Sequence, residues 1–113
     1  MDGAPVGHRV LAGAPDSPVV LHVPHAARTI PAAERAGLLL DDAGLAAELD
    51  LVTDSGTEVL AADAARAARR TPWSFVNLLS RLVVDPERFP DERETMRQVG
   101  MGAVYTRTSR GAR

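Results

Sequence analysis

The stretch Pro18-Val19-Val20-Leu21-His22-Val23-Pro24-His25 decides the fold of this 113-residue chain. Its apolar run predicts a buried strand over 18–23, and Pro24 ends that strand because proline fixes φ and has no N–H to donate. His25 follows at once, and in an open α/β sheet the ligand crevice forms outside the carboxyl ends of the strands. The sequence therefore makes His25 a candidate site residue, with a purely structural role as the alternative.

The segments after this strand predict three helices, over 31–36, 42–52 and 55–70. In the middle one, Leu45, Leu49 and Val52 recur at i, i+4 and i+7, which indicates one buried helical face. The last one is expected to begin at Ser55, because Ser55 and Glu58 have the spacing of a capping box. Its expected inward-facing residues are Val59, Leu60, Ala64, Ala67 and Ala68.

Two further strands are predicted, over 73–78 and 82–84, and the fully apolar second one is expected to be central. A short helix is expected over 91–99, closed by Gly100, and 103–105 is expected to be a strand or a loop. The long helical crossover makes the first two strands parallel, so the fold class is α/β. Residues 1–16 are expected to be a flexible lead-in to a domain portion over 17–113.

Composition narrows the classes of function. A formal net charge of −2 argues against a nucleic-acid-binding surface, and the absence of cysteine excludes disulfides and thiolate metal sites. No apolar run approaches the roughly 18 residues that a membrane-spanning helix needs. The N-terminus also lacks the charged-then-apolar order of a signal peptide, so a cytoplasmic location is expected.

Four motifs occur in order along the chain: Val23-Pro24-His25, Thr53-Asp54, the stretch from Ser80 to Arg93, and Gly100-Met101-Gly102-Ala103-Val104-Tyr105-Thr106-Arg107. Together they closely resemble the N-formylglutamate amidohydrolase family over about residues 17 to 108. The resemblance implies a partial three-layer α/β/α sandwich with a mixed, partly parallel sheet, similar to zinc-dependent exopeptidases. Members of the family are longer, so this chain is expected to be a truncated, N-terminal portion of such an enzyme.

The resemblance also implies zinc, with His25 and Asp54 as metal ligands. For Asp54, capping of a helix is the alternative. His22 is three residues from His25, which in a strand sends the two side chains to opposite faces, so His22 is expected to be a packed strand residue. The resemblance implies that a further histidine and an acidic catalytic residue come from the family's later half, which this chain does not contain. The chain also departs from relatives that carry a histidine shortly after the aspartate, because it has Ser55-Gly56 there.

Arg81, Asp85 and Arg88 form the second candidate constellation. By resemblance Arg88 matches an arginine that binds a substrate carboxylate, and guanidinium suits this task because it donates two parallel hydrogen bonds. Arg81 is a candidate for a second carboxylate, and Asp85 is expected to orient Arg88 or a metal ligand. The alternative is a surface ion pair of Arg88 with Glu87 or Asp91, which contributes little.

The function expected from the resemblance is zinc-dependent hydrolysis of N-formyl-L-glutamate to formate and glutamate. Its partners would be a small-molecule N-acyl amino acid and a C-terminal half or a second copy of the chain, but neither nucleic acid nor membrane. Three alternatives stay open: a hydrolase of another N-acyl amino acid, a non-catalytic fragment, and an assembly module that pairs with a separate C-terminal half. The chain alone is expected to be inactive.

Overall fold

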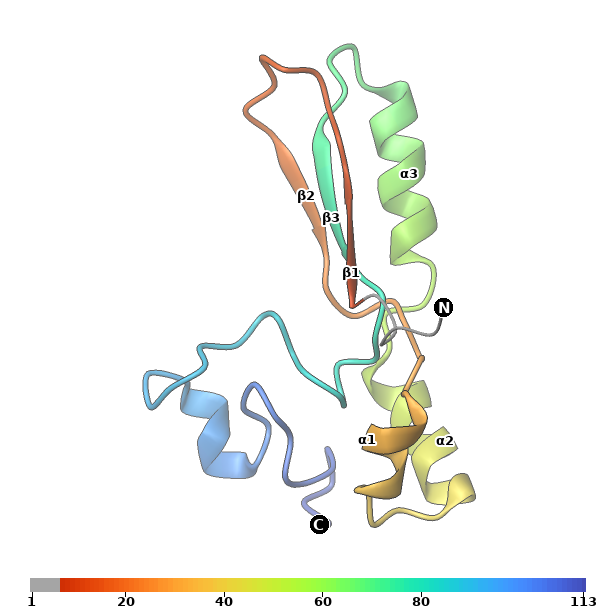
Figure 1. The fold of residues 1–113 in the computed structure, drawn as a ribbon, viewed down its shortest axis with the longest axis vertical. Helices are drawn as coiled ribbons and strands as arrows, with labels where there is room; N and C mark the ends of the chain where they lie inside the picture. Colours follow the sequence, from red (N-terminus) through yellow and green to blue (C-terminus); the bar gives the residue numbers. More distant parts are fainter. Residues whose placement is uncertain (1–6) are drawn as a thin grey trace.

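A three-stranded mixed sheet holds the segment that leads to His25 (Figure 1). It contains β1 (His8–Leu11), β2 (Val20–Val23) and β3 (Trp73–Asn77) in the order β1-β3-β2. The structure, a computed structural model, describes residues 7–113. Strands β2 and β3 are parallel, with Val20 opposite Trp73 and Val23 opposite Val76, which confirms the predicted crossover.

Strand β1 corrects the interpretation of residues 1–16 as a flexible lead-in. His8–Leu11 pairs antiparallel with β3, from His8 opposite Asn77 to Leu11 opposite Ser74. The remainder of the predicted lead-in before Gly7 lies outside the described residues. The pairing partner is far away in the sequence, so no local pattern indicated this strand.

The prediction of a central strand over 82–84 is wrong, because β3 is the central strand and Arg81–Val83 forms a turn. Ser80 is the physical reason. Its buried hydroxyl accepts a hydrogen bond from the Leu82 N–H, and its carbonyl accepts one from the Val83 N–H. A serine that satisfies the next backbone donors in this way favours a turn over a strand. Val84 is consequently 42% exposed.

Helices α1 (Ala32–Ala36) and α2 (Asp42–Val52) agree with the prediction. The Asp41 carboxylate caps α2 by accepting a hydrogen bond from the Gly44 N–H at 2.7 Å. Leu45, Leu49 and Val52 are buried as the spacing predicted. Both helices lie beyond one end of the sheet in Figure 1, and α2 leads to the loop that carries Asp54.

Helix α3 (Thr57–Ala67) runs alongside the sheet and contacts β2 (Figure 1). The predicted capping box is wrong: the N-cap is Gly56 at φ 88°, without a side-chain hydrogen bond, and the helix ends at Ala67 before the predicted Arg70. The predicted inward face is wrong as well, since Val59 and Leu60 are 57% and 68% exposed. The half-buried stripe consists of smaller side chains, namely Thr57, Ala61, Ala62 and Ala65.

The chain after β3 forms turns, a loop and one short helix. Glu94 caps a 3-10 helix, η1 (Thr95–Val99), which Gly100 ends at φ 74°. Residues 103–105 form a loop, one of the two predicted alternatives, with an isolated bridge between Met101 and Tyr105. A hydrogen bond of 2.7 Å from the Asp85 N–H to the Ala103 carbonyl ties this loop to the turn after β3.

The described residues form a small α/β fold with a mixed, partly parallel sheet, and the three-layer sandwich stays a prediction. His8 and His22 flank Phe75 on one face of the sheet, with ring centroids 5.3 and 5.4 Å from it. His22 was expected to be a packed strand residue, but its side chain is exposed and meets Phe75 edge-on. No helix in residues 7–113 has the length and apolar character needed to cross a membrane.

Candidate functional site

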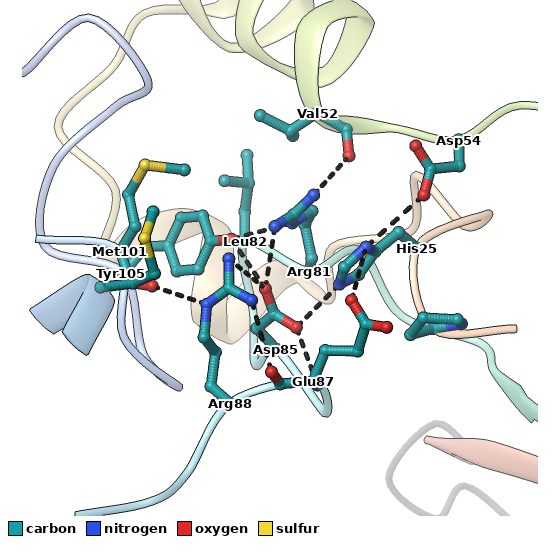
Figure 2. Close-up of polar contacts among 12 residues, drawn as sticks. His25, Val52, Asp54, Arg81, Leu82, Asp85, Glu87, Arg88, Met101 and Tyr105 are labelled. Atoms are coloured by element: carbon teal, nitrogen blue, oxygen red, sulfur yellow. Dashed lines mark hydrogen bonds and ion pairs between the residues drawn. The ribbon is translucent and has the colours of Figure 1, made fainter. Parts of the chain in front are cut away.

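The site is built around the carboxylate of Asp85, whose side chain is 0% exposed. The turn at Ser80 and the bond to Ala103 fix its backbone between two loops. The Oδ1 atom accepts hydrogen bonds from His25 Nε2 at 2.8 Å and from the Glu87 N–H at 2.9 Å. The Oδ2 atom accepts one from the Tyr105 hydroxyl at 2.7 Å, so three segments distant in sequence, around residues 25, 85 and 105, meet at one buried acid (Figure 2).

His25 occupies the position predicted for it, directly after the carboxyl end of β2, and is only 4% exposed. Two hydrogen bonds fix the backbone around it. The Asn77 side chain donates to the Pro24 carbonyl at 2.9 Å, and the Asp54 N–H donates to the His25 carbonyl at 2.8 Å. The second bond brings the loop after α2 beside the imidazole.

The contact with Asp85 determines which nitrogen of His25 carries the proton. Burial raises the pKa of Asp85, but hydrogen bonds from His25, Tyr105 and the Glu87 backbone outweigh burial and hold it below its usual value. Asp85 is therefore ionised at neutral pH and acts as an acceptor, so His25 Nε2 must be the donor. In neutral His25 this leaves the lone pair on Nδ1, which makes no hydrogen bond within the described residues.

Two carboxylates lie on the Nδ1 side of the imidazole (Figure 2). Asp54 Oδ2 is 3.5 Å from Nδ1, and Glu87 Oε2 is 3.8 Å from it. Both acids are about half exposed, at 58% and 50% of their side chains, so this side of the ring opens toward solvent. The structure thus brings together His25 and Asp54, the two residues that the resemblance implied as metal ligands, and their role as ligands stays a prediction.

The alternative role of Asp54 as a helix cap has no support in the geometry. No side-chain hydrogen bond caps α3, and it is the backbone carbonyl of Asp54 that accepts from the Thr57 hydroxyl at 2.8 Å. The carboxylate itself points to His25 in Figure 2.

Arg81 and Arg88 lie on the other side of Asp85, with side chains 15% and 14% exposed. Their NH2 atoms are 3.1 and 3.7 Å from Asp85 Oδ2. Arg81 also donates to the Tyr105 hydroxyl at 2.8 Å, and Arg88 donates to the Met101 carbonyl at 3.0 Å. These contacts replace the surface ion pair of Arg88 considered as an alternative. Both predicted clamp residues are thus gathered at Asp85, but much of their donor capacity is used inside the protein.

Tyr105 is a site residue that the sequence analysis did not single out. Burial, together with its hydrogen bond to Asp85 and the charge of that acid, raises its pKa to about 12, although Arg81 opposes the shift. It therefore remains a neutral donor at physiological pH. Glu87 enters the sequence analysis only as an alternative surface partner of Arg88. The signal for its position is its place two residues after Asp85, because an aspartate side chain often accepts a hydrogen bond from the N–H two residues further along, as Asp85 does here.

A cavity of about 320 Å³ adjoins this cluster at Tyr105. Its lining is mainly apolar and includes Leu38, Leu40 and Leu82, with Arg107 as a charged member. The cavity borders the arginine side of the cluster through Tyr105, and the Nδ1 side of His25 is a separate, polar surface.

The donor set fits zinc in part. Two ligands on one zinc ion, with bonds of roughly 2.1 Å and tetrahedral angles, lie roughly 3.4 Å apart. The 3.5 Å between His25 Nδ1 and Asp54 Oδ2 matches this spacing, and a carboxylate on the other nitrogen is the usual way to orient a metal-binding histidine. As the side chains stand, residues 7–113 hold no group of three or more His, Cys, Asp or Glu side chains that could bind a metal.

Comparisons with known proteins identify the family of the chain. One protein-family model, described as N-formylglutamate amidohydrolase, matches residues 17–113. The match begins just before β2 and includes His25, Asp54, Asp85 and Tyr105. Searches of curated proteins and of solved structures gave no significant match.

Proposed function

The chain belongs to the N-formylglutamate amidohydrolase family, and from this membership we propose that it contributes a zinc-binding half-site for hydrolysis of N-formyl-L-glutamate or a similar N-acyl amino acid. One observation supports the proposal above all others. His25 is buried, its Nε2 is held by Asp85, and its Nδ1 faces Asp54 at ligand spacing.

The candidate site residues lie on two sides of Asp85, and the residues of each side have a different proposed role. On one side, His25 and Asp54 offer one nitrogen and one oxygen donor. A zinc ion bound there would supply Lewis acidity toward the amide carbonyl and lower the pKa of water. Asp85 keeps the proton of His25 on Nε2, so that Nδ1 stays available as a donor.

On the other side, Arg81 and Arg88 would attract and orient the carboxylates of the substrate. Their two positive charges exceed the single charge of Asp85, so this side keeps a net positive charge. Guanidinium groups that are already fixed by Asp85, Tyr105 and Met101 lose little side-chain entropy when an anion binds. Binding a carboxylate would require one of these internal hydrogen bonds to be exchanged, and the contact of Arg88 with Asp85, at 3.7 Å, is the weakest.

Zinc affinity, measured by competition with a chromophoric chelator, tests the proposal on the purified chain. We expect one zinc site that His25→Ala abolishes and His8→Ala leaves unchanged, because His8 is exposed on β1 and lies outside the cluster. A chain whose zinc binding is the same with and without His25 would contradict the proposal.

Formate release from N-formyl-L-glutamate is the second measurement. Turnover that disappears in the His25→Ala variant would assign the chemistry to this chain. Zinc binding without turnover is the expected result, because no catalytic acid or base is assigned within the sequence.

A further inference from the structure

We propose that the cavity beside Tyr105 binds a small carboxylate with an apolar body, whose hydrocarbon part contacts a group of leucines and whose carboxylate pairs with Arg107. The cavity has a volume of about 320 Å³, at the lower end of the roughly 300–1,000 Å³ that is typical of small-molecule sites. His25 is not part of its lining, so the inference does not depend on zinc or on the proposed hydrolysis.

One wall of the cavity consists of leucines. Leu38, Leu39 and Leu40 follow one another in the segment between α1 and α2, and Leu82 is the fourth. None of the four belongs to the buried core, and Leu39 is 81% exposed. Connecting segments usually carry polar side chains. Three consecutive leucines that line a cavity therefore leave apolar surface that a ligand can remove from water, which is favourable.

The opposite wall is the segment 105–108, which hydrogen bonds hold at both ends. Ser109, directly after this segment, donates from its N–H to Glu48 Oε2 at 2.7 Å and from its hydroxyl to Oε1 at 2.8 Å. Glu48 is 4% exposed on α2, so both of its oxygens are engaged inside the protein. The hydroxyl of Tyr105 donates to Asp85 at 2.7 Å. The wall is thus pre-organised, and a ligand spends little binding free energy on ordering it.

Arg107 supplies the charge that selects a carboxylate. Within residues 7–113 its guanidinium pairs with no acid, and its one side-chain hydrogen bond there goes to the Gly111 carbonyl at 3.2 Å. Gly100 makes room for its stem, because a Cβ at Gly100 would lie 2.7 Å from Cβ and Cγ of Arg107. Guanidinium donors that remain available can bind a carboxylate through two parallel hydrogen bonds. Among the lining side chains, Arg107 and Arg113 also outnumber the single acid, Glu48.

The experiment is a ligand-observed NMR titration of the full chain with 4-methylpentanoate, a branched acid with one carboxylate. The matched alcohol, 4-methylpentan-1-ol, has the same hydrocarbon body without the charge. Leu39→Asn is compared with Leu60→Asn, because both leucines are exposed, at 81% and 68%, and only Leu39 lines the cavity. Arg107→Gln is compared with Arg110→Gln, an exposed arginine of the same segment outside the lining. Circular dichroism confirms that each variant is folded.

We expect 4-methylpentanoate to bind at one site and more tightly than the alcohol. Leu39→Asn should weaken this binding by roughly tenfold, which corresponds to burial of part of a leucine side chain against the ligand. Arg107→Gln should remove the preference for the acid and leave binding of the alcohol unchanged. The two control variants should match the wild type.

N-formyl-L-leucine shares this ligand chemistry and distinguishes its two sources. Tighter binding of N-formyl-L-leucine than of 4-methylpentanoate would assign the cavity to N-acyl amino acids with apolar side chains. Weaker or equal binding would assign it to simple branched acids.

Absence of binding, or binding that is the same in Leu39→Asn and in the wild type, would overturn the proposal. A second copy of the chain is the competing occupant. A dimer that Leu39→Asn dissociates, in a chain that binds no 4-methylpentanoate, would assign the leucines to an interface and overturn the proposal as well. His25→Ala should leave this binding unchanged, so its failure is distinct from that of the proposed function, which zinc affinity tests.

Discussion

Replacement of Asp85 by asparagine should destabilise the fold more than any other change of one carboxylate to its amide. Asp85 has no exposed side-chain surface and accepts four hydrogen bonds or ion contacts shorter than 3.2 Å, from His25, Tyr105, the Glu87 N–H and Arg81. Asparagine would keep one acceptor oxygen. Its amide nitrogen, however, would face the Tyr105 hydroxyl or the Arg81 guanidinium, both of which now donate to Asp85.

The expected loss follows from the burial of the charges. Removal of one partner of a buried ion pair costs about 3–5 kcal/mol, because the other charge stays buried without compensation. The two arginines that face Asp85 have side chains only 15% and 14% exposed, so solvent compensates them poorly. Domains have a total free energy of unfolding of about 5–15 kcal/mol, so this loss would remove a large part of the stability.

The assay is urea or thermal unfolding followed by circular dichroism. The melting temperature of Asp85→Asn should fall by roughly 10–20 °C. The matched control is Asp91→Asn, which removes an exposed carboxylate that pairs with Arg93, and its unfolding midpoint should equal that of the wild type. A loss of less than about 1 kcal/mol in Asp85→Asn would refute the idea that this acid organises the cluster.

The pH dependence of the stability difference between the wild type and Asp85→Asn provides a second test. The folded-state pKa of Asp85 lies below its usual value of 3.8, so its stabilisation is fully present above that value and is lost as the pH falls through the folded-state pKa. The gap in stability between wild type and Asp85→Asn should therefore be constant near neutral pH and shrink in acid. A gap that stays the same throughout would mean that the charge of Asp85 is not its source.

Two further predictions concern Tyr105 and the apolar core. Tyr105 is the only tyrosine of the chain, so the absorbance of its phenolate should titrate near the pKa of about 12. The raised pKa contributes at most about 2–3 kcal/mol to the free energy of unfolding. This contribution is fully present below pH 10.0 and is lost as the pH rises through the folded-state pKa. A titration near 10.0 would show that the hydroxyl is not held by Asp85. Leu49→Ala should cost about 2–4 kcal/mol in chemical unfolding, because Leu49 is 8% exposed, whereas Leu60→Ala, at a position 68% exposed, should change stability by less than about 0.5 kcal/mol. Equal losses in the two variants would contradict the burial pattern of α2 and α3.

The elements that the sequence predicted correctly have local signals. Pro24 ends β2, and the spacing of Leu45, Leu49 and Val52 defines α2, with Asp41 as its cap. Each of these signals acts within a few residues, so no knowledge of the tertiary structure is needed to interpret them.

The failures have non-local causes. Strand β1 exists because β3 lies beside it, and all four of its residues are exposed, so it has no buried alternation to detect. The apolar run at 82–84 resembles a strand, but Ser80 turns the chain so that Asp85 reaches His25. Helix α3 turns its small alanine side chains toward the sheet, because small side chains allow the helix to approach the sheet closely. Val59 and Leu60 are exposed to solvent instead.

The same distinction applies to the candidate site. His25 could be predicted because the end of a strand is a favoured place for a site, and the role of Asp85 in orienting a neighbour was also anticipated. Tyr105 and Glu87 could not be assigned as partners of Asp85, because tyrosine and glutamate occur in many structural settings. Their roles depend on which side chains lie next to them in the tertiary structure. Their contacts join residues 25, 85 and 105, which only the tertiary structure brings together.

The polar cluster also bears on stability, because the apolar core of the described residues is small. Its buried members are Val23, Leu45, Leu49 and Val52, from β2 and α2, and none comes from the chain after β3. That later part is tied to the rest by polar contacts instead, such as Asp85 with His25 and Ser109 with the buried Glu48. A cation bound at His25 would stabilise the folded state by mass action. A variant that weakens cation binding should therefore also lower the free energy of unfolding measured with the cation present. Residues that act through Asp85 must therefore be tested by metal affinity as well as by unfolding, since unfolding alone would not separate a site residue from a structural one.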